Sequence, residues 1–431
     1  MVKTKTEGTI YIKRLKRVMS ALKKEGGDAA LFLSSAPEVS RSRDENYPYK
    51  QHSDFYYLTG SKRKDTALLV TTKCDQPIIF AIKDDPKQIL WEGTSEDPAE
   101  IARRCDAELV LCQDIYTEIL PGMNGIDVLY YQNIPNTIAW NITKRIISQP
   151  SWLRGPLPSR FNHSDVILEP LRLIKDSSEI QKIQNSINLT AACLYGIIPL
   201  ITAGATEGEI QAAFDYNLRL RGACPAFKTI VAAGASASVL HYDKHSEVLK
   251  NKQLLMIDCG AEYEMYCGDI TRTYPIGGRF EGVLREIYSI VLSAQKAAIA
   301  TIKHGVKMQK VYAAAAKKMI RGLKDLGVLK GDERDLFKSG AILPYFPHSI
   351  GHSLGLDVHD IGKLRADKET ILEAGMVITV EPGLYFQKAQ KGIPRCGIRI
   401  EDDVLVTKTG HQILGNPIPK EIADLEALMI G

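Results

Sequence analysis

The sequence predicts a mixed α/β (α+β) fold in two domains, and three observations lead to this prediction. Short apolar runs alternate with helical periods in the first part of the chain, which is typical of α/β structure. Longer helical periods follow, separated by β-branched runs with polar ends. The chain has 431 residues, more than one hydrophobic core usually holds. We place the boundary near residue 172, which gives domains 1–172 and 173–431.

The first domain begins with a helical pattern and continues mainly as strands. Residues 10–25 carry apolar side chains at helical spacing, and Gly26 and Gly27 end the pattern. A second helix is expected near 98–104. The apolar runs predict strands at 29–33, 66–71, 77–82, 108–112 and 128–131.

An aromatic stretch interrupts this alternation at residues 43–60, RDENYPYKQHSDFYYLTG. We interpret it as a polar loop whose aromatic exit packs at a domain edge. The alternative is a contact with substrate or with another subunit.

The pattern changes after a proline-rich break at residues 149–163. Asp176 or Ser177 suits the N-cap of a long helix, and Thr206 suits the start of the next. Helices are expected over 178–197, 206–220, 282–302 and 308–326.

Composition excludes several classes of protein. The formal net charge is +4, and no charged tract indicates binding to nucleic acid or a membrane surface. No apolar run approaches the roughly 20 residues that span a bilayer. The eight cysteines are scattered without a CxxC pair, which favours reduced thiols and a cytoplasmic location. The basic N-terminus fits a native first helix better than a transit segment.

The stretch 254–275, LLMIDCGAEYEMYCGDITRTYP, carries the first candidate site. Asp258 ends one strand-like run, and Asp269 opens the next. If the two strands pair, both carboxylates can face one point. Such a pair is costly unless positive charge lies between them, so we expect a divalent metal.

Three later stretches add polar side chains to this site. Residues 348–360 contain three histidines, residues 377–381 form a β-branched strand ending in Glu381, and 397–402 place Arg399 and Glu401 on one strand face. Each has an ordinary alternative: a satisfied core histidine, a solvated glutamate, a polar loop at 357–360, or a helical face shared by His348 and His352. Their combination favours a functional site.

The residue types also restrict the metal. Carboxylates with one or two imidazoles and no thiolate suit Mn, Co, Fe or Zn. Four carboxylates balance two divalent ions. A water shared by two such ions loses a proton readily and becomes a nucleophile near neutral pH.

These residues resemble the creatinase/aminopeptidase ("pita-bread") fold, and within it the aminopeptidase P family. The resemblance rests on the motifs IDCGAEYEMYCGDITRTYP, HSIGHSLGLDVHD, TVEPGLY, GIRIEDDVLVT and VLHYDK, together with the aromatic stretch at 43–60. It covers nearly the whole chain. It implies an N-terminal creatinase-like α/β domain and a C-terminal pita-bread metallopeptidase domain.

The resemblance implies a ligand set for two divalent ions, with manganese preferred and cobalt, zinc or iron as alternatives. Asp258 would chelate one ion, while His352 and Glu381 would bind the other. Asp269 and Glu401 would bridge the two. Glu381 would also act as general base and later as acid.

Four further residues receive substrate roles from the resemblance. His348 and His359 would hold the substrate carbonyl and stabilise the tetrahedral intermediate. His241 would line the pocket, and Arg399 would buffer the carboxylates. Phe227 is our candidate for part of the wall that accepts proline.

The implied activity is removal of the N-terminal residue from peptides with proline second, by a homodimer or homotetramer whose N-terminal domain restricts access. The alternative enzyme is a prolidase acting on Xaa-Pro dipeptides, but GDITRTYP and NYPYKQHSDFYYLTG look more like the aminopeptidase branch. Residues 1–172 argue against a methionine aminopeptidase, and the retained ligands argue against creatinase. A non-catalytic peptide-binding protein of this fold is disfavoured because all five ligand positions are kept.

Overall fold

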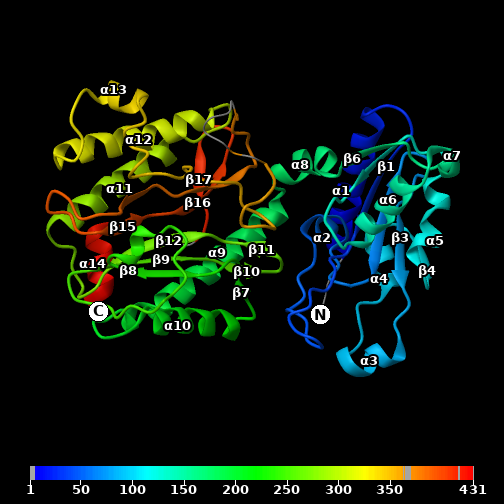
Figure 1. Ribbon diagram of the computed structural model, residues 1–431, viewed down its shortest axis with the longest axis horizontal. Helices are drawn as coiled ribbons and strands as arrows, with labels where there is room; N and C mark the ends of the chain where they lie inside the picture. The colour runs from blue at the N-terminus through cyan, green and yellow to red at the C-terminus, as the bar shows by residue number, and fades with distance from the viewer. Residues whose placement is uncertain (1–4, 363, 365–369, 416–417, 431) are drawn as a thin grey trace. The chain divides into compact units, whose positions relative to one another are not determined.

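A computed structural model describes residues 5–362, 364, 370–415 and 418–430. The chain divides into two units, Met1–Arg172 and Leu173–Gly431, drawn in Figure 1. The first four residues of the basic N-terminus lie outside the described residues.

A six-stranded sheet forms the centre of the first unit (Figure 1). Its order is β4-β3-β2-β1-β5-β6, with β1 antiparallel to β2 and parallel to β5. The strands are β1 (Ala29–Ser34), β2 (Thr66–Thr71), β3 (Ile78–Ile82), β4 (Glu108–Cys112), β5 (Val128–Tyr131) and β6 (Arg160–His163). The five strands expected from the sequence are confirmed, and β6 adds an edge.

Helices cover both faces of this sheet. Ala30 and Phe32 of β1 pack with α5 and α6 in one core cluster, whereas the alternate residues of β1 face α1 and α2. A strand buried on both faces reads as a continuous apolar run, as β1 does. The helices are α1 (Lys5–Lys24), α2 (Ser53–Thr59), α3 (Pro86–Glu92), α4 (Pro98–Cys105), α5 (Ile115–Ile119), α6 (Ile138–Ser148), α7 (Ser151–Arg154) and α8 (Asp165–Leu173).

The exit of the aromatic stretch is helical, which the sequence did not predict. All seven residues of α2 are buried, and Gly60 ends the helix in the left-handed conformation with φ 65°. Phe55 and Tyr57 are fully buried, whereas Tyr47 in the preceding loop is exposed. The packing interpretation therefore holds for α2. A seven-residue helix buried on every side has no amphipathic period to reveal it.

Two pairs of long helices pack in the second unit, α9 with α10 and α11 with α12. Both caps expected from the sequence are present as capping boxes, Asp176 with Glu179 and Thr206 with Glu209. The helices are α9 (Ser177–Ile197), α10 (Glu207–Leu220), α11 (Gly282–Thr301), α12 (Met308–Asp325), α13 (Glu333–Lys338) and α14 (Ile422–Ile430).

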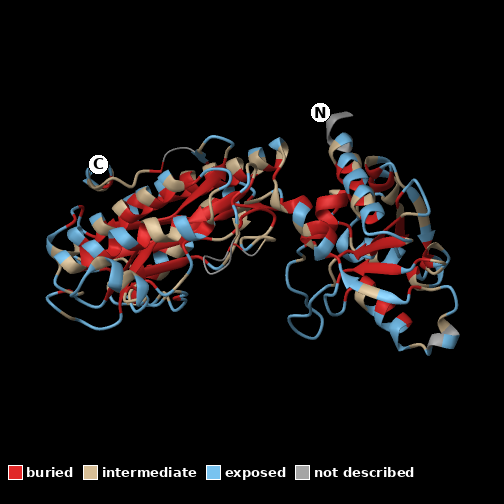
Figure 2. Ribbon diagram, turned by 90° about the horizontal axis from the view of Figure 1, so that it is seen from above, coloured by how far each residue is buried: buried red, intermediate tan, exposed pale blue. Residues whose placement is uncertain are grey.

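Short antiparallel strands lie against these helices and are mostly buried (Figure 2). They form the groups β12-β9-β8, β13-β16-β17, β14-β15 and β11-β10-β7. The strands are β7 (Cys224–Pro225), β8 (Ile230–Ala233), β9 (Leu254–Cys259), β10 (Ala261–Tyr263), β11 (Tyr266–Cys267), β12 (Ile270–Pro275), β13 (Val377–Val380), β14 (Gly383–Phe386), β15 (Cys396–Arg399), β16 (Asp402–Val406) and β17 (His411–Ile413).

All eight cysteines lie in the described part of the chain, and none is joined to another by a disulfide. Six are buried, Cys224 is partly buried, and Cys74 is exposed.

Among the helices of the described chain, none has both the length and the apolar character required to cross a membrane.

Candidate metal centre

The two aspartates of the first candidate stretch lie at the same end of a strand pair. β9 and β12 pair in antiparallel register, with Asp258 opposite Thr271. Asp269 immediately precedes β12. A Cβ atom on Gly260 would lie 1.8 Å from the carbonyl oxygen of Gly268, so only glycine permits this approach of the backbone.

His352 and Glu381 come together because residues 350–354 run beside β13. The amide of Glu381 donates to the carbonyl of Ile350, and that of Thr379 donates to the carbonyl of His352, both at 2.9 Å. No helix runs over residues 346–354, so the alternative in which His348 and His352 share a helical face is wrong.

Glu401 reaches the same place from the link between β15 and β16. Its amide donates to the carbonyl of Thr271 at 3.1 Å. The Thr271 hydroxyl donates to Glu401 Oε2 at 2.7 Å. Glu401 is thus fixed to β12, on the same side as Asp258 and Asp269.

Ligand atoms of Asp269, His352 and Glu401 all lie within 4.8 Å of one another. His352 Nε2 is 3.5 Å from Asp269 Oδ2 and 3.6 Å from Glu381 Oε1. A cavity of about 700 Å³ opens onto this cluster. Its lining includes every site residue predicted from the sequence: Phe227, His241, Asp258, Asp269, His348, His352, His359, Glu381, Arg399 and Glu401.

The donor set fits a cation. His352 Nδ1 lies 3.1 Å from the carbonyl of Ser353, which only accepts, so Nδ1 carries the proton and Nε2 presents a lone pair. That lone pair faces carboxylate oxygens, and acceptors cannot hydrogen-bond to one another. Asp258 Oδ1 and Asp269 Oδ1 are also buried without a hydrogen-bond donor. Divalent metal would satisfy all of these acceptors.

The carboxylates repel one another in a buried site. Burial, reinforced by the Glu401 charge, raises the pKa of Asp269 well above its usual value. Burial and the Glu381 charge do the same to the pKa of Glu401. Burial raises the pKa of Glu381 to about 8, although Arg399 opposes the shift. These shifts identify groups whose ionised forms need nearby positive charge.

Arg399 supplies part of that charge. Its guanidinium donates to Asp258 Oδ2, to the Thr271 hydroxyl at 3.2 Å and to the Tyr385 hydroxyl at 2.7 Å. The Tyr385 hydroxyl oxygen in turn lies 2.9 Å from His348 Nε2. Burial and the nearby Arg399 charge lower the pKa of His348 to about 3, so His348 is neutral and accepts from Tyr385.

The remaining predicted residues surround the cluster. The rings of His352 and His359 pack edge to face with centroids 4.3 Å apart. His241 follows β8 and lines the cavity. Phe227 packs against the backbone at Gly260, where its Cε1 lies 3.1 Å from the place a Cβ would occupy.

Thr271, Tyr385 and Asp403 are site residues that sequence reasoning missed. The Asp403 carboxylate accepts from the backbone amide of Asp269 at 2.9 Å. All three lie inside the motifs that carry the family resemblance. Thr271 and Asp403 each lie two residues from a proposed ligand, and that position was the signal that could have found them. Tyr385 lies four residues after Glu381 and offered no such signal.

The paired strands and their buried carboxylate–imidazole cluster define a metallohydrolase site. Residues 181–408 match metallopeptidase family M24, and residues 11–129 match the aminopeptidase P N-terminal domain. The chain belongs to the aminopeptidase P group of family M24. It is therefore a metallo-aminopeptidase that uses divalent metal.

Similarity to individual proteins extends over almost the full length. The chain is 36% identical to the Xaa-Pro aminopeptidase of Haemophilus influenzae over 417 residues, covering 93% of each. Aminopeptidase PepP of Pseudomonas aeruginosa has a solved structure similar to this one with a TM-score of 0.91 and 32% identity, covering 98% of both chains. Zinc-substituted aminopeptidase P of Escherichia coli in complex with product gives 0.90 and 31%, covering 97% of this chain and 98% of that one.

Proposed function

We propose that this protein hydrolyses the first peptide bond of peptides whose second residue is proline, and that two divalent ions, preferably manganese, serve the reaction. The observation that carries the proposal is the buried cluster in which an imidazole lone pair and several carboxylate oxygens face one another at one end of a cavity. The substrate class comes from relatives of the chain such as the Xaa-Pro aminopeptidase of Haemophilus influenzae.

Five residues would hold the ions: Asp258, Asp269, His352, Glu381 and Glu401. We assign Asp258 to one ion, His352 and Glu381 to the other, and Asp269 and Glu401 to both. When bound, the ions supply Lewis acidity toward the scissile carbonyl and a water of lowered pKa.

The chain's own side chains then bind, orient and move protons. Glu381 takes a proton from the attacking water and returns it to the leaving proline nitrogen. His359 would hold the substrate carbonyl as it gains negative charge. His348 lines the same cavity, but both of its ring nitrogens are engaged, Nδ1 with the Ser349 carbonyl and Nε2 with the Tyr385 hydroxyl, so it would have to release one of them to contact that carbonyl. Arg399 orients Asp258, since its guanidinium donates directly to that carboxylate.

Substrate selection follows from the charge and shape of the cavity. A free N-terminal ammonium group is attracted to the carboxylate edge, so chain ends are favoured over internal bonds. His241 and Phe227 would contact the proline ring and its tertiary amide. Following the aminopeptidase P family that the chain resembles, we propose a homodimer or homotetramer in which domain 1–172 limits the access of substrates to the metal site. The scattered cysteines, which lack CxxC spacing, favour a reducing location, and we propose the cytoplasm.

The test compares hydrolysis of Arg-Pro-Pro with that of Ala-Pro, with Mn²⁺ added and after chelation, on the same preparation. We expect metal-dependent release of free arginine from the tripeptide. Glu381→Gln is the matched variant, because it keeps the side-chain shape but loses the proton carrier. Cleavage of the dipeptide alone would instead identify a prolidase, and inactivity on both peptides with metal bound would overturn the proposal.

A further inference from the structure

Lys175 is a buried lysine outside the proposed ligand set. It lies between α8 and α9, and its side chain is 1% exposed. Its backbone amide donates to the carbonyl of Gly375 at 2.9 Å. Its ammonium group lies 3.1 Å from Asp360 Oδ2 and 3.4 Å from the Ser353 hydroxyl. A buried ammonium group is unfavourable unless such partners compensate it.

Both partners of the ammonium group directly follow a site histidine in the chain. Ser353 follows His352, and Asp360 follows His359. The amide of Asp360 also donates to the carbonyl of Ser353 at 2.9 Å, the same carbonyl that fixes His352 Nδ1. The Lys175 ammonium group therefore connects the residues that follow His352 and His359, whose rings pack edge to face.

Gly355 leaves the space that this junction occupies. A Cβ atom there would lie 2.2 Å from Asp360 Oδ2 and 3.1 Å from Lys175 Cε. Residues 353–360 can therefore fold back so that the aspartate reaches the lysine. The fold-back at Gly355 and the Lys175–Asp360 pair bring together His352 and His359, which are seven positions apart in sequence.

We propose that Lys175 is a positioning residue that fixes the distance and angle between His352 and His359. This inference rests on the proposed function, in which His352 binds metal and His359 holds the substrate carbonyl. Such groups must be held within about 0.5 Å of the productive geometry. A buried ion pair is often replaceable by apolar residues without loss of stability, so removing both charges separates positioning from folding.

The test uses the double variant Lys175→Met/Asp360→Leu, which removes both charges of this buried pair together. We expect a urea midpoint near that of the wild type, a kcat for Arg-Pro-Pro lowered about 10- to 100-fold, and a smaller change in KM. We also expect an altered visible spectrum of the Co²⁺-loaded protein. A crystal structure of the metal-free variant should show that the 4.3 Å spacing of the imidazole centroids is lost.

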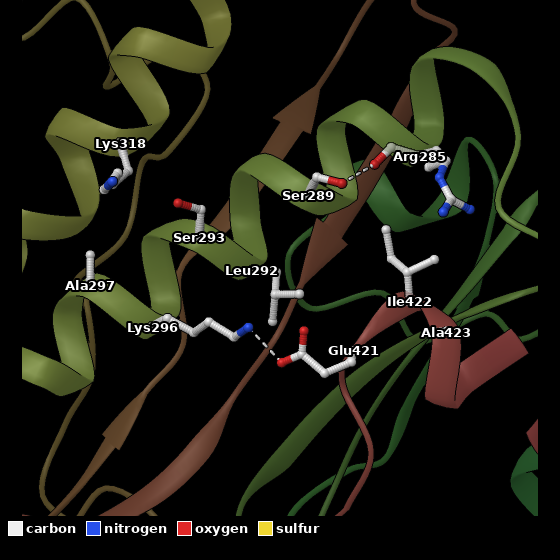
Figure 3. Close-up of a pocket in the computed structure, with 10 residues that line it drawn as sticks. All are labelled: Arg285, Ser289, Leu292, Ser293, Lys296, Ala297, Lys318, Glu421, Ile422 and Ala423. Atoms are coloured by element: carbon white, nitrogen blue, oxygen red, sulfur yellow. Dashed lines mark hydrogen bonds and ion pairs between the residues drawn. The ribbon is translucent and has the colours of Figure 1, made fainter.

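Asp360→Asn is the second variant, because it keeps the shape of the side chain and removes only its charge. It keeps an oxygen that can accept from the Lys175 ammonium group, so the variant should fold with reduced stability and give an intermediate fall in kcat. The matched control is Lys296→Met. Lys296 forms a 2.6 Å ion pair with Glu421 in a separate hollow beside α11 (Figure 3), and its loss should leave kcat and the cobalt spectrum unchanged.

Wild-type kcat, cobalt spectrum and imidazole spacing in the double variant would overturn the positioning role. If the double variant does not fold, an unchanged kcat and spectrum in Asp360→Asn would overturn it. The spectrum and the metal-free structure decide the inference even if the wild type does not cleave Xaa-Pro bonds, so the two failures remain distinguishable.

Discussion

Thr271 connects most of the charged groups at the centre through one hydroxyl. That hydroxyl donates to Glu401 Oε2 and accepts from Arg399 Nε, and Arg399 holds Asp258. A single uncharged side chain therefore orients a proposed bridging carboxylate and the cation beside it. Hydrogen bonds to metal ligands commonly govern affinity as strongly as some ligands do.

Replacing Thr271 with valine should weaken metal binding. Valine keeps the branched shape that suits β12 but leaves Glu401 without its donor. We expect metal affinity or kcat to fall about 10- to 100-fold, measured by titration of the metal-free protein and by peptide hydrolysis. The control is Thr273→Val, because its hydroxyl donates only to the backbone carbonyl of Arg399 at 2.9 Å. Equal effects of the two substitutions would contradict the role given to Thr271.

Arg272 makes a second residue-scale prediction, this time for stability. Its guanidinium is fully buried and pairs with Asp402 at 2.6 Å. Arg272→Met breaks the pair and should destabilise the second unit by about 3–5 kcal/mol, measured by urea unfolding. Arg285→Met removes a 2.8 Å pair with Glu426 in which the arginine side chain is 49% exposed, and should cost only about 0–1 kcal/mol. Similar midpoints for both variants would show that Arg272 is dispensable.

Residues 350–354 are not a regular strand, but their backbone hydrogen bonds to residues 379 and 381 align His352 with Glu381. The closeness of this segment to β13 depends on Gly351, where a Cβ atom would lie 1.9 Å from the carbonyl oxygen of Thr379. Backbone atoms cannot move aside as a flexible side chain can. The alignment of the two proposed ligands thus depends on the absence of one methyl group.

Gly351→Ala should separate the segment from β13 and reduce kcat together with stability. Overpacking of this kind typically costs about 1–3 kcal/mol. Peptide hydrolysis and thermal unfolding measure the two effects. Gly410→Ala is the control, because the nearest atom to its Cβ would be 4.0 Å away. An alanine at 351 that binds metal and turns over substrate normally would disprove the alignment argument.

Sequence patterns predicted elements where periodicity and caps were strong, and failed where burial was complete or the element was very short. The capped helices α9 and α10 were predicted within one or two residues. The helix α2 and the β10–β11 hairpin were not, since a seven-residue helix buried on every side and a two-residue strand carry no usable period. The proposed ligands were found through their residue types and motifs. Tyr385 and Lys175 were not, because their contacts come from segments distant in sequence.

At the scale of the whole molecule, all proposed metal ligands lie in the second unit. Removing metal should therefore lower the unfolding temperature of that unit and leave the transition of residues 1–172 unchanged. A metal ion present at a free concentration 100 times its dissociation constant would stabilise the folded unit against unfolding by about 2.7 kcal/mol per site. Calorimetry with and without a chelator measures the shift. A chelator that moved both transitions equally, or neither, would contradict the assignment.

Alkylation of the cysteine thiols can report which of the two units has unfolded. Burial raises the pKa of Cys105 to about 12 and that of Cys193 to about 11, so both thiols resist alkylation in the folded protein. Cys74, Cys105 and Cys112 belong to the first unit, and the other five belong to the second. After brief treatment with iodoacetamide, the intact mass of each molecule gives the number of alkylated cysteines. Because the first unit has three cysteines and the second has five, this number would distinguish molecules in which the first unit has unfolded from those in which the second has.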